Sequence, residues 1–206
     1  MTHYQVHKPS FGEFLASMRG IDSPVILLEG SRKVSEEHAP LLTKLGSRLA
    51  RALPGARFRS GNAEGSDTLF AEGVQSVDPA RMQVVTPYVG HRKKNLHPRY
   101  EVCALSEVSA VQERALADAS SEATPGNRSL MEKRNTHPRL GAKAKYLLRD
   151  TLKVVGDPEN GLAPATVGLF YTGEDPMKGG TGHTIRVCQQ EQVPFVLFRQ
   201  WSRWVD

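Results

Sequence analysis

Apolar residues gather in five short runs along the chain. The run at residues 24–29 contains four consecutive apolar side chains, and further runs cover residues 56–60, 82–87, 165–171 and 194–198. Short continuous runs of this kind are typical of parallel strands that are covered on both faces. Each run therefore predicts a strand of one sheet.

Stretches with apolar residues three and four positions apart separate these runs, which is the spacing of an amphipathic helix. The spacing predicts helices over residues 11–18, 35–53, 68–77, 100–118, 140–155 and 184–191. Strands that alternate with helices indicate an α/β fold with a doubly wound, mainly parallel sheet of about five strands or more.

The interval from residue 88 to residue 164 breaks this alternation, because it is far longer than a simple crossover requires. Residues 119–127 and 158–164 are rich in small residues or in Gly and Pro and predict loops between the helices. We expect residues 88–164 to form a helical insertion before the penultimate strand. The whole chain, residues 1–206, is predicted to be a single domain.

Composition agrees with a globular protein. Of the 206 residues, 39% are hydrophobic and 24% are charged, which is ordinary for one soluble domain. No apolar run approaches the roughly 20 residues of a membrane span, and no signal-peptide pattern is present, so a cytoplasmic location is expected. Cys103 and Cys188 are too few and too far apart to predict a disulfide framework or a zinc site. Neither a metal nor a cofactor is predicted.

The net charge of +5 is unevenly distributed. Basic residues concentrate in two stretches, residues 91–99 and residues 128–149. Such stretches form either a solvated basic face or a surface that contacts phosphate groups of a nucleic acid, and the sequence leaves both open.

The segment from Tyr171 to Thr184 carries the strongest functional pattern. It joins a predicted strand to a predicted helix and contains Gly173, Gly179, Gly180 and Gly182. Backbone amides at such a turn, together with the N-terminus of the following helix, form a binding site for an anion such as phosphate. The alternative is a tight turn that uses glycine only for its backbone freedom.

Two further turns follow the first and second strands. The first contains Gly30, Ser31 and Arg32, and the second covers residues 61–67. Because ligands of open α/β sheets bind beyond the carboxyl ends of the strands, we expect all three turns to meet at one edge.

Two of these turns resemble a known family. Residues 60–67, SGNAEGSD, resemble the first glycine turn of the DNA-processing protein A family, and residues 179–184, GGTGHT, resemble the second glycine turn of the wider SLOG superfamily. This superfamily also includes the lonely-guy phosphoribohydrolases and YspA- and YpsA-like proteins. Residues 127–131 are similar to a third segment of these proteins, for which Arg134-Asn135 is a competing match.

The resemblance implies a Rossmann-like domain that holds a nucleotide or a nucleotide-derived ligand, such as a nucleoside phosphate or an ADP-ribose-like molecule, between paired turns. Together with the placement of the turns, it gives these candidate ligand contacts: Gly30, Ser31, Arg32, Gly61, Asn62, Glu64, Gly65, Ser66, Asp67, Arg128, Gly173, Gly179, Gly180, Thr181, Gly182, His183 and Thr184.

Differences between this sequence and the family determine whether an enzymatic activity is expected. The phosphoribohydrolases carry a glutamate where this chain has Arg186, and a cation cannot replace a carboxylate that stabilises an oxocarbenium ion. Binding is therefore favoured over N-glycosidic hydrolysis, and whether the protein is an enzyme is left open. If it is a nucleotide hydrolase, the carboxylate must come from another acid: Glu174, Asp175, Glu64 or Asp67. Of these, Glu174 and Asp67 are the candidate catalytic residues.

Two interactions with macromolecules are further expectations. Single-stranded DNA binding, as in the DNA-processing proteins, is an alternative function, although aromatic residues for base stacking make up only 7% of the chain. The apolar stripe of residues 100–118 could form a homodimer interface. No contact with a membrane is expected.

Overall fold

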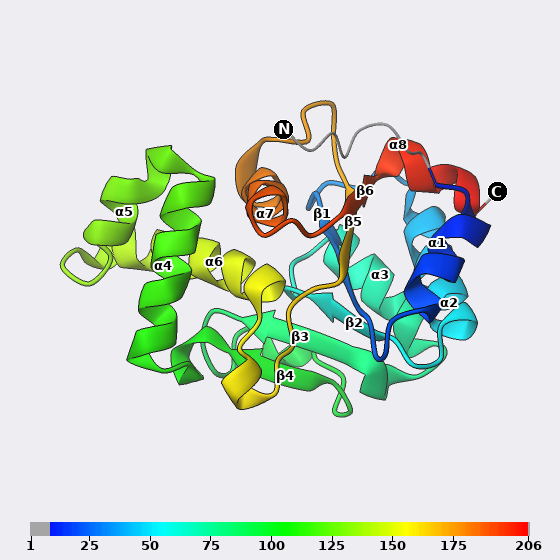
Figure 1. The fold of residues 1–206 in the computed structure, drawn as a ribbon, viewed down its shortest axis with the longest axis horizontal. Coiled ribbons are helices and arrows are strands. Elements are labelled where there is room, and N and C mark those ends of the chain that lie inside the picture. Colours follow the sequence, from blue (N-terminus) through cyan, green and yellow to red (C-terminus); the bar gives the residue numbers. More distant parts are fainter. Residues whose placement is uncertain (1–8, 206) are drawn as a thin grey trace.

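The computed structural model describes residues 9–205, and its centre is a sheet of six parallel strands (Figure 1). The strand order is β4-β3-β2-β1-β5-β6. The strands are β1 (Val25–Gly30), β2 (Arg57–Ser60), β3 (Met82–Thr86), β4 (Glu101–Ala104), β5 (Val167–Tyr171) and β6 (Phe195–Leu197). This confirms the prediction of an α/β doubly wound sheet, with one strand more than the five apolar runs.

Eight α-helices surround the sheet in the described part of the chain. They are α1 (Phe11–Arg19), α2 (Ala39–Ala52), α3 (Ser66–Gln75), α4 (Ala110–Ala123), α5 (Arg128–Glu132), α6 (Pro138–Val155), α7 (Gly179–Gln190) and α8 (Phe198–Trp201). Between residues 9 and 205, no helix combines the length and the apolar composition that crossing a membrane would require.

The strands are apolar on both faces because helices cover both faces. Along β1, Ile26 and Leu28 pack in one core with α1, α2 and α3, whereas Leu27 packs in a second core with α7. Figure 1 shows the resulting layers, with α1, α2, α3 and α8 on one side and α4, α5, α6 and α7 on the other. This alternation also determines which side each polar residue of a strand faces.

Helices α2 and α3 cross at a close approach of two glycines. A Cβ atom at Gly73 would lie 2.1 Å from the carbonyl oxygen of Thr43, and one at Gly46 would lie 2.5 Å from the carbonyl oxygen of Phe70. The absence of side chains at these two positions therefore allows the helix backbones to touch.

The sequence-based boundaries are wrong in the span before β5. Residues 101–104, predicted as the start of a helix, form β4 at the edge of the sheet, where Val84 pairs with Val102. Helix α4 then continues through most of the predicted loop at 119–127. Hydrogen bonding to β3 outweighs the helical spacing of residues 100–118. The spacing of apolar residues along the chain contains no information about pairing with a neighbouring strand.

Helix α7 also begins earlier than predicted, at Gly179 instead of Thr184. The glycine-rich segment thus forms the first turns of the helix, and the turn itself covers residues 172–178. The amides of the first turn are placed at the helix N-terminus as a consequence.

We predict that Gly73→Ala lowers the free energy of unfolding by about 1–3 kcal/mol, because the added methyl group must push α2 and α3 apart. Gly55→Ala is the matched control, since no heavy atom lies within 4 Å of a Cβ at this position. Urea denaturation of both variants measures the difference, and equal stability of the two would contradict the close packing.

Candidate ligand-binding site

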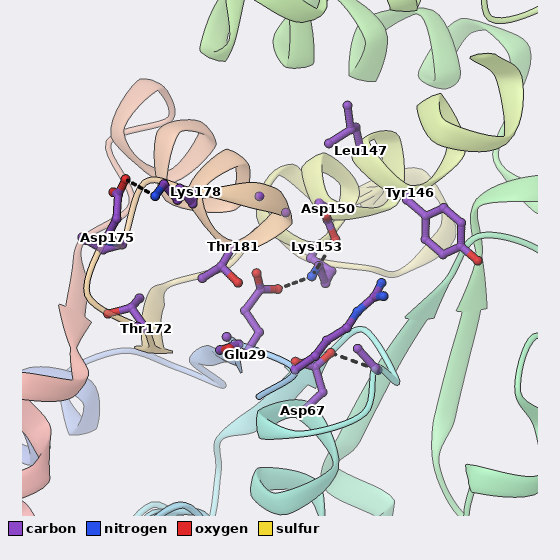
Figure 2. Close-up of a pocket in the computed structure, with 18 of the residues that line it drawn as sticks. Glu29, Asp67, Tyr146, Leu147, Asp150, Lys153, Thr172, Asp175, Lys178 and Thr181 are labelled. Atoms are coloured by element: carbon purple, nitrogen blue, oxygen red, sulfur yellow. Dashed lines mark hydrogen bonds and ion pairs between the residues drawn. The ribbon is translucent and has the colours of Figure 1, made fainter. Parts of the chain in front are cut away.

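A cavity of about 700 Å³ lies where the strand order reverses, between β1 and its neighbours β2 and β5. Its walls are the end of β1, the loops that follow β1 and β5, the first turn of α7 and one face of α6, together with Ala63 and Asp67 from the segment after β2. Figure 2 shows the side chains of α6 and α7 on one side of this cavity and those of β1 and α3 on the other. Ligands of doubly wound sheets bind at this reversal point.

The floor of the cavity contains a buried carboxylate, Glu29. It lies two positions after Leu27 and therefore faces the same side of the sheet, toward α6 and α7. Its side chain is only 4% exposed and accepts a hydrogen bond from the Lys153 ammonium group through Oε2. Lys153 also lies 2.9 Å from Oδ1 of Asp150, so one cation joins two carboxylates.

Arg149 extends this network to the loop after β2. Its guanidinium group contacts Oδ1 of Asp150 at 2.5 Å and donates to the carbonyl oxygen of Gly61 at 2.8 Å. A Cβ at Gly61 would lie 2.9 Å from Arg149 Cζ, so only glycine leaves room for the guanidinium group here. The same loop is held by Asp67, whose Oδ2 accepts from the amides of Gly61 and Ala63, both at 3.1 Å.

The surroundings shift the pKa values of the Glu29 and Asp150 carboxyl groups in opposite directions. Burial raises the pKa of Glu29 to about 7, with further upward contributions from Asp150 and Asp67 that the Lys153 ammonium only partly offsets. For Asp150, burial acts upward but the adjacent Arg149 and Lys153 cations outweigh it and lower the pKa to about 2. Glu29 is thus the group of the floor that changes charge near neutral pH.

The first turn of α7 borders the same cavity. Gly182 donates the first amide hydrogen bond within the helix, to the carbonyl oxygen of Lys178 at 3.0 Å. The amides of Gly179, Gly180 and Thr181 precede it and belong to the part of a helix that has no internal acceptors. They line the cavity.

Charged side chains also surround the entrance. Arg32, Lys143 and Lys178 are exposed cations on three separate elements, and Glu174 and Asp175 are exposed acids of the loop after β5. Lys178 and Asp175 lie 3.9 Å apart. Such an exposed pair contributes little energy, so these cations are available to a ligand.

The structure brings about half of the sequence-predicted site residues together. The predicted residues that line the cavity are Gly30, Ser31, Arg32, Asp67, Gly173, Glu174, Gly179, Gly180 and Thr181. They come from the turns after β1, β2 and β5, which meet at one edge of the sheet as expected.

Other predicted residues of the turn after β2 hold the loops in place. The Ser66 hydroxyl donates to the carbonyl oxygen of Ser31 at 2.5 Å, and Gly65 packs against the backbone of Arg32. Asn62 points its amide toward the loop after β3, and the exposed Glu64 pairs with Arg92 at 3.5 Å. Arg128, by contrast, is exposed on α5 and does not line the cavity.

His183 lies outside the cavity, contrary to its expected contact with a phosphate. Its ring is buried between α4, α6 and α7, where its nitrogens lie 3.0 Å from the Thr124 hydroxyl and 3.1 Å from the Thr151 hydroxyl. Burial lowers the pKa of His183, which favours the neutral ring. Its neighbours Gly182 and Thr184 are also buried and do not line the cavity, which α7 borders only with Gly179, Gly180 and Thr181.

Arg186 forms hydrogen bonds to two other segments. Its Nε donates to the Thr124 hydroxyl at 2.9 Å and its Nη1 donates to the carbonyl oxygen of Met177 at 3.0 Å. The side chain therefore ties α7 to the end of α4 and to the loop after β5, outside the lining of the cavity.

Several lining residues were missed by sequence reasoning. They include Glu29, Tyr146, Arg149, Asp150 and Lys153. The α6 residues could have been recognised in the sequence. Their positions have the spacing of one helix face, and all four are polar or charged: Tyr146, Arg149, Asp150 and Lys153. The end of the first apolar run at Glu29 has no comparable signal, since an acid after a strand is most often solvated.

The sequence matches no family model and no curated protein. The structure is similar to a solved structure of DNA processing protein A from Helicobacter pylori, from a study of its single-stranded DNA binding mode. The two chains are 16% identical, the match covers 88% of this chain and 67% of the other, and the TM-score is 0.51. The two chains share a fold.

We predict that Glu29 makes stability depend on pH near neutrality. Because its folded-state pKa is raised to about 7, the folded chain binds a proton that the unfolded chain releases, and this contribution is lost as pH rises through 7. The unfolding free energy of the wild type relative to Glu29→Gln should therefore fall between pH 5 and pH 7, with a slope approaching about 1.4 kcal/mol per pH unit. Urea titrations at four pH values measure it, and a constant difference would contradict the raised pKa.

Proposed function

We propose that the cavity binds a nucleotide or nucleotide-derived ligand, with a phosphate group at the N-terminus of α7. The observation that carries this proposal is that the free amides of Gly179, Gly180 and Thr181 border a cavity at the reversal point of the sheet. Oriented amides and the helix dipole stabilise an anion there. A cavity of about 700 Å³ is within the range of small-molecule sites.

The charge distribution supports the same orientation of the ligand. The cations Arg32, Lys143 and Lys178 lie at the entrance, whereas the floor contains more carboxylates than cations. A phosphate group is therefore favoured at the entrance and disfavoured at the floor. The membership of the SLOG superfamily that the two glycine turns suggest is part of this proposal.

Hydrolysis by the carboxylates that the sequence pointed to has less support. Glu174 is exposed and makes no hydrogen bond to any described residue, and Asp67 already accepts two backbone amides. Binding is therefore the function that the geometry favours.

Single-stranded nucleic acid is the second candidate ligand, favoured by a row of three aromatic rings that ends at Tyr146, which lines the cavity. The rings of Tyr88 and His91 lie 5.0 Å apart, and those of His91 and Tyr146 lie 5.9 Å apart. The exposed Lys93 and Lys94 follow on the same loop. Aromatic rings next to cations are the features that bind single strands, and the protein with the similar fold was studied for single-stranded DNA binding.

We predict that Thr181→Glu weakens nucleotide binding at least about tenfold, because its carboxylate would occupy the first turn of α7 and repel the phosphate. Thr181→Gln is the matched neutral control and should bind more tightly than the glutamate variant. A ligand at 100 times its dissociation constant should raise the melting temperature of the wild type by about 5–11 °C. The test is a thermal-shift screen of nucleoside monophosphates, NAD and ADP-ribose. No shift with any of them would refute the proposed function.

For the second candidate, we predict that Lys93→Glu together with Lys94→Glu weakens binding of a labelled oligodeoxythymidine by at least about tenfold at low salt. Wild-type affinity should fall steeply as salt rises, because binding to phosphates releases counterions. Fluorescence anisotropy provides the measurement. Binding that is equally strong in the variant would exclude this loop as the contact surface.

A further inference from the structure

The floor of the cavity offers hydrogen-bond acceptors that the protein does not use. Among the described residues, no group donates to Oε1 of Glu29, to Oδ1 of Asp67 or to Oδ2 of Asp150. Within residues 9–205, the side-chain nitrogen and oxygen atoms that are both buried from solvent and without a hydrogen-bond partner are Ser60 Oγ and Arg92 Nη1. The three carboxylate oxygens therefore remain accessible from the cavity.

The cations of the floor are already occupied. Lys153 is bound by Glu29 and Asp150, and Arg149 is bound by Asp150 and by the carbonyl oxygen of Gly61. An anion at the floor would also meet the carboxylates of Glu29, Asp67 and Asp150, which repel it. No group of three or more His, Cys, Asp or Glu side chains within residues 9–205 is arranged to hold a metal ion. The unused acceptors of the floor thus favour a ligand group that donates hydrogen bonds.

Glu29 is the acceptor best placed for such a group. Its side chain is 4% exposed, it lines the cavity, and its other oxygen is fixed by Lys153. Figure 2 shows it pointing from β1 toward α6 and α7, with Thr181 and Lys153 nearby. A hydrogen bond to a fixed carboxylate with little access to water is stronger than one to an exposed carboxylate.

Contacts connect this acceptor to the anion site. Oδ2 of Asp150 lies 3.1 Å from the position of a Cβ at Gly180. Oδ1 of Asp150 binds Lys153, which in turn binds Glu29. The first turn of α7 and Glu29 are therefore separated by two side chains, so a single small molecule can reach both.

We propose that Glu29 is a specificity-determining residue that accepts a hydrogen bond from a ribose hydroxyl of the ligand, so that the site selects ribonucleotides over deoxyribonucleotides. In this arrangement the phosphate lies at the first turn of α7 and the sugar lies over the floor. The base lies toward Tyr146, a half-exposed ring at the wall of the cavity. The inference rests on the proposed nucleotide-binding function.

The test compares the four common ribonucleoside 5′-monophosphates with their 2′-deoxy and 3′-deoxy counterparts by isothermal titration calorimetry at pH 8, where Glu29 is mostly ionised. At least one deoxy form should bind about 10- to 100-fold more weakly than the ribonucleotide, the worth of a hydrogen bond to a charged group. Glu29→Gln should weaken binding of the ribonucleotide and bring the ratio of the deoxyribonucleotide and ribonucleotide dissociation constants close to one. Glu37→Gln, an exposed acid outside the cavity, should leave the ratio unchanged.

The outcomes separate this inference from the proposed function. Equal affinities of the wild type for the ribonucleotide and both deoxy forms would overturn the role of Glu29 and leave nucleotide binding standing. An unchanged ratio in Glu29→Gln would also overturn it. If none of the nucleotides binds, both proposals fail.

A second comparison needs no variant and removes the base from the ligand. If the 2′-deoxy nucleotide is the weaker form, ribose 5-phosphate should also bind more tightly than 2-deoxyribose 5-phosphate to the wild type. Equal binding of the two sugar phosphates in that case would overturn the assignment of the donor to the ribose hydroxyl.

Discussion

The structure depends on a buried ion network in which Lys153 of α6 bridges Glu29 of β1 and Asp150. Arg149 connects the same cluster to the loop after β2 through Gly61. An unpaired buried charge destabilises a folded protein by several kcal/mol. The side chains of the network therefore hold one another in place, because moving one would leave the charge of another unpaired. Helix α6, the loop after β2 and the first strand therefore occupy one defined arrangement around the cavity. A buried Arg59 adds hydrogen bonds from β2 to the end of α6 and to the loop before β5.

The network also makes the floor of the cavity differ in charge from its entrance. Its charges are satisfied internally apart from free carboxylate oxygens, whereas the amides of α7 and the cations of the entrance have no strong partner. A ligand with a phosphate at one end and hydrogen-bond donors at the other matches this distribution. The two candidate ligands, a free nucleotide and a single strand, share the phosphate and the base. The proposed hydrogen bond from a ribose hydroxyl to Glu29 would distinguish a ribonucleotide from a strand of DNA.

The sequence was sufficient to predict the sheet, the three turns and their common edge, because those features depend on local spacing and on glycine positions. It was insufficient for β4 and for the floor. Residues 101–104 have helical spacing and become a strand through pairing with β3. Glu29 meets Lys153 across 124 positions, a contact that no local pattern encodes. The glycine-rich segment predicts His183 as a phosphate ligand because His183 belongs to it. In the structure, the ring of His183 packs against α4 and α6 and does not line the cavity.

The most direct test of the central claim is a crystal structure of the protein with a bound ribonucleoside 5′-monophosphate. The account predicts phosphate oxygens at about 2.7–3.2 Å, hydrogen-bond distance, from amides of residues 179–181, with the ribose next to Glu29. A nucleotide bound instead along the aromatic row of Tyr88, His91 and Tyr146, with its phosphate at Lys93 and the cavity free of ligand, would contradict it.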